Sequence, residues 1–145
     1  MEKEEIIKKL YQDFKVVKQS LQQLVDEGHP ERAYIALGSI CDESFAFQTE
    51  DVKKIPEEDV MIMLVQHRLF SEFQLYVLGE LLMLEGSIFF NKKIYRQSKI
   101  SFTYALRIFT HLSETATERK QYETDPLERM MKSMEMIQRI KQAME

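Results

Sequence analysis

Residues 71–112 constrain the fold most, because they indicate two helices joined by a tight polar turn. The apolar part of the first helix, FQLYVLGELLMLEGSIFF, contains only two charges, which favours a central and mostly buried helix. Gly79 and Gly86 lie seven residues apart, and a 3.6-residue period places both on one face. Ser98 and Ala105 repeat that spacing in the second helix. Small residues should therefore meet small residues across an antiparallel pair, and we expect the two helices to approach closely.

The rest of the chain also favours helices. Its 145 residues are 44% hydrophobic and 30% charged, a balance that supports one folded domain. Only 4 Gly and 3 Pro interrupt long stretches in which apolar residues recur three and four apart. Residues 42–56 fit no long helix, and we expect an ordered connector with a short turn near Thr49. We predict a single all-α domain of five or six helices, at residues 3–26, 30–41, 57–65, 71–91, 95–117 and 126–143.

Local signals mark several helix ends. Gly28 suits the end of the first helix, where a left-handed residue is favoured, and Pro30 suits the first turn of the next. Ser71 and Gln74 match a capping box, so we expect a break in the helix just before Ser71. Residues 125–128, with sequence DPLE, indicate the start of the last helix.

Charge and hydropathy argue against nucleic acid and membranes as partners. A net charge of -4 offers no general attraction to phosphate backbones or anionic lipids. The apolar run at 75–90 is too short for a bilayer and is interrupted by Glu80 and Glu85. The opening MEKEEIIKKL lacks the apolar core of a secretion signal, and Cys41 is the only cysteine, which fits a reducing compartment. We therefore expect a cytoplasmic protein.

Large, small and aromatic residues recur along the central pair at Leu82, Gly86, Phe89, Tyr95, Ser98, Phe102 and Ala105. These seven positions resemble the signature of the tetratricopeptide repeat. Glu85 and Lys93 depart from it, since that family usually has leucine and a turn glycine at these places. More loosely, residues 33–109 resemble a family of small uncharacterised bacterial proteins with tetratricopeptide-like helices. The resemblance implies antiparallel helical hairpins, a cytoplasmic location and protein–protein contact, and it implies no catalytic residue.

The residues that carry most chemistry form no recognisable site. His29, His67 and His111 lack partners at metal-ligand spacing, and no glycine-rich loop could hold a phosphate group, so we expect neither a metal nor a cofactor. Cys41 lies on an apolar helical face and is expected in the core. The basic residues at 92–99 are expected to form a solvated turn.

Glu80 and Glu85 are candidates for a functional role, because acids in a buried helix often have altered pKa values. A separation of five residues points them about 140° apart around the helix, so they are not a catalytic carboxylate pair. We expect each carboxylate to find a basic partner or the solvent edge.

Two features suggest where a partner could bind. The helix at 95–117 is apolar on two sides, and the side facing away from the glycines carries Ile100, Tyr104, Ile108 and His111. The helix at 126–143 has an apolar stripe that includes Met130 and Met134. This helix could cap the stack and cover the second face, exchange with a second copy, or bind a partner.

The leading hypothesis is a non-enzymatic module that buries an apolar helix or peptide of another protein against Tyr104 and its neighbours. The alternative is a self-associating structural protein that dimerises through the methionine-rich helix or the first helix. An enzyme is the third hypothesis.

Overall fold

The computed structural model describes residues 3–45 and 47–145, and these residues form helices and connecting segments without a strand. The expected all-α fold is confirmed. The described part of the chain has seven α-helices rather than five or six, because a short helix also forms in the connector, at Thr49–Lys53. They are α1 (Lys3–Asp26), α2 (Pro30–Phe45), α3 (Thr49–Lys53), α4 (Val60–Ile62), α5 (Glu72–Asn91), α6 (Tyr95–Thr115) and α7 (Pro126–Met144).

Several bounds differ from the expected ones. Helix α2 continues four residues further than predicted, and its last residue, Phe45, stacks on Phe70 with ring centroids 5.4 Å apart. Helix α4 lies between the 3-10 turn Glu57–Asp59 and the π turn Met63–His67, so residues 57–67 form one irregular helical segment. A further 3-10 turn, Arg119–Gln121, was not predicted.

The break before α5 has the expected cap. The hydroxyl of Ser71 accepts a hydrogen bond from the backbone N–H of Gln74, and the Gln74 side chain accepts one from the backbone N–H of Ser71. Leu69, two residues earlier, has a φ of 57°, a left-handed conformation in which a helix of L-residues cannot continue. The capping box and this backbone turn together separate α5 from the irregular helical segment at 57–67.

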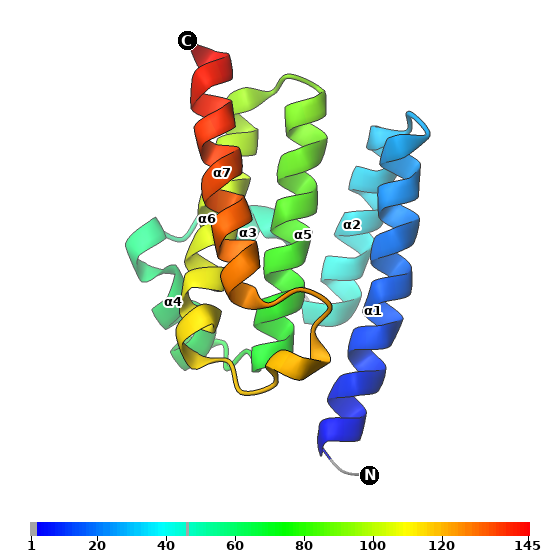
Figure 1. Ribbon diagram of the computed structural model, residues 1–145, viewed down its shortest axis with the longest axis vertical. Coiled ribbons are helices and arrows are strands. Elements are labelled where there is room, and N and C mark those ends of the chain that lie inside the picture. The colour runs from blue at the N-terminus through cyan, green and yellow to red at the C-terminus, as the bar shows by residue number, and fades with distance from the viewer. Residues whose placement is uncertain (1–2, 46) are drawn as a thin grey trace.

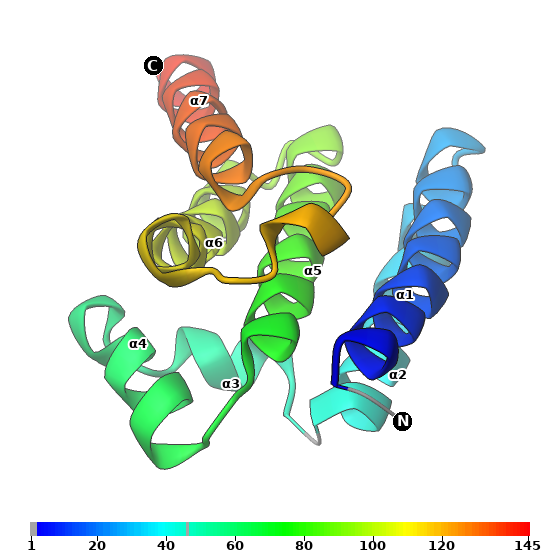
Figure 2. The same cartoon turned by 60° about the horizontal axis from the view of Figure 1, so that its bottom comes forward.

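Helix α5 lies at the centre of the molecule. The antiparallel pair α1 and α2 packs on one side of it, and α6 packs along the other (Figure 1). Helix α7 lies along α6, while α3 and α4 contact a different side of α6 (Figure 2). Helix α5 is long and apolar enough to cross a membrane by length and composition alone, but 72% of its most apolar window is buried inside the molecule.

The glycines of α5 allow the close approach of α6, but aromatic rings occupy the space above them. The Ser98 hydroxyl donates to the carbonyl oxygen of Gly86 at 2.7 Å, which joins two of the small positions predicted to meet. A Cβ built on Gly86 would lie 2.6 Å from the Phe102 ring, and one on Gly79 would lie 2.7 Å from the Phe109 ring. Each glycine therefore receives a phenyl ring of α6, and the pair is locked in one register.

We predict that Gly86→Ala lowers the free energy of unfolding, because its methyl group would collide with Phe102. Overpacking in a core costs about 1–3 kcal/mol, and the better helix propensity of alanine returns about 0.5–1 kcal/mol. The expected net loss is about 1–2 kcal/mol in urea unfolding. Combining Gly86→Ala with Phe102→Leu should cost less than the two single changes together, because the smaller side chain makes room.

Gly38 in α2 is the matched control, because a Cβ there would meet its nearest neighbour, Gln48, at an ordinary 3.4 Å. Gly38→Ala should leave stability unchanged or raise it by up to about 1 kcal/mol. Equal effects at Gly38 and Gly86 would contradict the proposed role of the phenyl contact.

Candidate functional site

The outer face of α6, expected to bind a partner, is partly covered by the chain itself. Tyr104 is 8% exposed and its hydroxyl donates to the backbone carbonyl oxygens of Lys53 and Ile55. Ile108 is fully buried, while Ile100 and His111 are half-buried. The segment that follows α3 therefore occupies part of the face where a partner helix was expected, and Tyr104 and Ile108 expose little surface.

Helix α7 covers a different side of α6 and leaves its own outer side open. Ser133, Met136 and Ile140 are buried, and Met130 is half-buried with its sulfur 3.8 Å from the Ser113 hydroxyl. Met134 lies on the outer side and is 52% exposed. The two methionines predicted as site residues are therefore separated, one in the α6 contact and one facing solvent.

The Glu85 carboxylate is fully buried where α3, α5 and α6 meet. It forms an ion pair with Lys53, whose ammonium group also lies 5.3 Å from the centre of the Phe89 ring. Hydroxyl groups of Thr49 and Ser101 donate hydrogen bonds to it at 2.6 and 2.8 Å. The prediction of a basic partner is confirmed, and two hydroxyl groups add hydrogen bonds to the same carboxylate.

The Glu80 carboxylate is buried on the opposite side of α5, between α1 and α7. Lys18 of α1 pairs with one of its oxygens, and the Nε atom of Arg129 in α7 lies 2.6 Å from the other. The Arg129 contact is an ion pair without hydrogen-bond geometry. Glu80 thus also has the expected basic partners, and the two acids of α5 face different neighbours.

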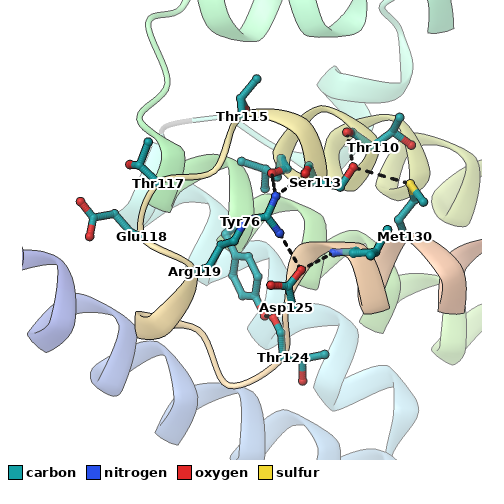
Figure 3. A network of polar contacts seen from close by, with 12 residues as sticks. Tyr76, Thr110, Ser113, Thr115, Thr117, Glu118, Arg119, Thr124, Asp125 and Met130 are labelled. Atoms are coloured by element: carbon teal, nitrogen blue, oxygen red, sulfur yellow. Dashed lines mark hydrogen bonds and ion pairs between the residues drawn. The ribbon is translucent and has the colours of Figure 1, made fainter.

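A polar network holds the α6–α7 connection (Figure 3). The Arg119 guanidinium donates to Asp125 at 2.7 Å and to the carbonyl oxygens of Ser113 and Leu112, near the end of α6. The Leu112 oxygen also accepts from the backbone N–H of Ala116. Asp125 also caps α7 by accepting from the backbone N–H of Leu127, and this bond and Arg119 lower its pKa. Arg119 therefore links the end of one helix to the start of the next.

Three tyrosines and Glu72 fasten the same connection to the core. The rings of Tyr76 and Tyr122 stack at 4.0 Å, and Tyr11 of α1 meets both edge-on. The Glu72 carboxylate accepts hydrogen bonds from the Tyr122 hydroxyl and from the backbone N–H groups of Thr117 and Glu118. Burial alone would raise the pKa of Glu72, but these bonds to its charged form lower it. Nothing in the spacing of these residues indicated this arrangement.

Cys41 is fully buried, and burial raises the pKa of its thiol to about 12 despite a hydrogen bond from the backbone of Thr49. A thiol of this kind is a poor nucleophile. His29 and His67 are exposed. Within residues 3–45 and 47–145, no group of three or more His, Cys, Asp or Glu side chains is placed to hold a metal ion.

An apolar groove of about 450 Å³ opens between the α1–α2 pair and α5, and we call it the α1–α2–α5 groove. None of its lining residues was predicted as a site residue. The apolar residues of the connector, including Phe45, could have indicated it, but their spacing shows no period that would fix their direction. The groove is lined by Asp13, Phe14, Val17, Ile40, Glu43, Phe45, Phe73, Gln74 and Val77.

No protein-family model, curated protein or solved structure matches this chain. The resemblance to tetratricopeptide repeats therefore stays a prediction.

We predict that Glu85→Gln lowers the free energy of unfolding by about 3–5 kcal/mol. Glutamine keeps the size of the side chain and an acceptor for the hydroxyl groups, but it leaves the buried Lys53 ammonium without a counter-charge. Urea unfolding followed by circular dichroism measures the loss.

Glu50→Gln is the matched control, because Glu50 contacts the same Lys53 at 3.5 Å from an exposed position. Exposed pairs contribute up to about 1 kcal/mol, so this variant should remain near wild-type stability. Losses of similar size in the two variants would show that burial of Glu85 is unimportant.

We also predict that Cys41 in the folded protein reacts with a disulfide reagent at pH 7.5 at least about 100-fold more slowly than an ordinary thiol. The raised pKa leaves almost no thiolate, and the surrounding core excludes the reagent. The rate should rise to the ordinary value in guanidinium chloride. In a Cys41→Ala background, Val17→Cys supplies an exposed control thiol, and fast labelling of Cys41 itself would contradict its burial.

Proposed function

We propose that this protein is a non-enzymatic protein-interaction module that contacts its partner through the outer side of α7. Leu127, Met131 and Met134 recur four and three residues apart, so they share one face of the helix. They are 48%, 60% and 52% exposed. We call these three residues the methionine stripe, and it is the observation that carries the proposal.

The chemistry of the stripe suits binding to an irregular apolar surface. Methionine is flexible and polarisable, and it recurs where one face must adapt to a partner. The half-buried Met130 and Ile137 continue the apolar surface toward α6. A contiguous apolar patch on a helix gains free energy when a partner removes it from water.

The groups that could perform chemistry are engaged in structural contacts, which supports a non-enzymatic function. Glu80 and Glu85 are held in ion pairs, and the Cys41 thiol is buried and protonated. The resemblance to tetratricopeptide repeats, which implies protein–protein contact, points the same way. The partner surface is moved from Tyr104 to α7, since Tyr104 is covered.

Self-association through the same stripe is the second candidate, because two α7 helices packed in antiparallel orientation would bury both exposed stripes. The macrodipoles of the two helices would then be antiparallel, which is the favourable arrangement.

We predict that the protein sediments as a monomer over a wide concentration range and captures a partner from its native cell. The variant Met131→Lys/Met134→Lys should lose that partner, because two charges on the stripe prevent its burial in an apolar interface. Lysine and methionine have similar helix propensities, so α7 should remain folded by circular dichroism.

Gln19→Lys/Gln97→Lys is the matched control, since it adds the same charge to exposed helical positions outside α7. The control should retain the partner. A wild-type dimer that becomes monomeric only in the methionine variant would instead establish self-association. If the methionine variant captures the same proteins as the wild type, the stripe is not the binding surface.

A further inference from the structure

We propose that the α1–α2–α5 groove binds one turn of a cationic amphipathic helix from another protein. This surface is distinct from the methionine stripe on α7. The inference shares with the proposed function only the premise that the protein binds proteins, and it adds a second site and the chemistry of its ligand.

The groove exists because the rings at its borders are turned toward other neighbours. Phe45 stacks on Phe70, and Phe73 packs edge-on against Tyr11 with ring centroids 6.2 Å apart. Figure 2 shows the α1–α2 pair standing to one side of α5. Residues from all three helices line the groove.

The surface of the groove is mainly apolar and reaches solvent. Val17 is 38% exposed, and Ile40, Phe45 and Phe73 are half-buried. A volume of about 450 Å³ lies within the range of pockets that hold a ligand. Burial of apolar side chains from a partner would remove both surfaces from water.

The dimensions of the groove fit about one helical turn. Its lining covers Asp13–Val17 on α1, Ile40–Phe45 on α2 and Phe73–Val77 on α5. Each stretch spans four or five residue steps along its helix, and a rise of about 1.5 Å per residue makes this a little more than one turn. A partner helix with two apolar residues three or four apart would match that length.

The charges at the groove favour a cationic ligand. Asp13 and Glu43 are exposed carboxylates in its lining, and the described lining contains no Lys or Arg. The end of α2 at Phe45 adds the partial negative charge of a helix C-terminus. The first turn of α5 also borders the groove, but Ser71 and Gln74 cap its N–H groups. Lysine or arginine beside the apolar residues of the partner would therefore find complementary charge.

The test uses two fluorescent 14-residue peptides with the same leucine face, one with lysine and one with glutamate on the polar face. Binding to the full chain is measured by fluorescence anisotropy at low salt. We expect the lysine peptide to bind at least tenfold more tightly than the glutamate peptide. Asp13→Lys/Glu43→Lys should weaken lysine-peptide binding at least tenfold and strengthen glutamate-peptide binding.

Glu114→Lys/Glu145→Lys is the matched control, because both residues are exposed and lie outside the groove lining. Replacing an acid with lysine raises the net charge by two, so both double variants bring the formal net charge from -4 to zero. The control should keep most of the preference for the lysine peptide. If the two variants weaken binding equally, net charge alone attracts the peptide and the inference is overturned.

A second measurement locates the peptide without any substitution in the groove. A photoreactive benzophenone in place of one leucine should cross-link to α1, α2 or α5. Cross-linking to α7 would place the peptide on the methionine stripe and overturn the inference.

A third measurement uses Val17→Asn, which removes apolar surface from the groove without changing its charge. This variant should weaken the binding of both peptides.

Two outcomes separate this inference from the proposed function. Met131→Lys/Met134→Lys should bind the lysine peptide as the wild type does, whatever its effect on partner capture. If the chain alone is a dimer that Asp13→Lys/Glu43→Lys dissociates, a second copy fills the groove, and the assignment to another protein is wrong. If no peptide binds while partner capture through α7 persists, only the groove inference fails.

Discussion

The contact of two phenyl rings with two glycines is the constraint on which the other layers depend. Phe102 and Phe109 lie over Gly86 and Gly79, with the same seven-residue spacing on both helices. Because the rings enter only where a Cβ is missing, α6 cannot slide along α5 without a steric collision. Helix α7 and the segment at 49–67 both pack on α6, so they take their positions from this register.

The two buried acids of α5 also help to fix the positions of the elements packed around this helix. Glu80 pairs with α1 and α7, and Glu85 is bonded by α3 and α6. Buried ion pairs often contribute little net stability, because removing charges from water offsets their attraction. Each buried carboxylate nevertheless requires a basic partner within contact distance, since an unpaired charge in a core is strongly disfavoured. In this protein they select one arrangement of four surrounding elements around an otherwise apolar helix.

The helices, their caps and the need of Glu80 and Glu85 for partners could be predicted from local patterns, because periodicity and capping depend on near neighbours in sequence. The choice of Lys18, Lys53 and Arg129 could not, since long basic side chains occur throughout the sequence and follow no period. The covering of Tyr104 also escaped prediction, because the connector that supplies Lys53 and Ile55 shows no apolar period. The groove depends on how the α1–α2 pair docks, which is a property of tertiary packing.

The α1–α2 pair packs against fewer neighbouring elements than α6 does, so it should separate from the rest of the molecule more easily. Helix α6 is enclosed by α5, α7 and the segment at 49–67, whereas the α1–α2 pair meets the remainder mainly along α5. Its polar attachments include the Tyr11–Glu123 hydrogen bond and the Lys18–Glu80 ion pair. Regions with fewer buried contacts open at lower free energy. We therefore expect the α1–α2 pair to open as a separate cooperative unit, whose backbone amides exchange with solvent before those of the α5–α6 core.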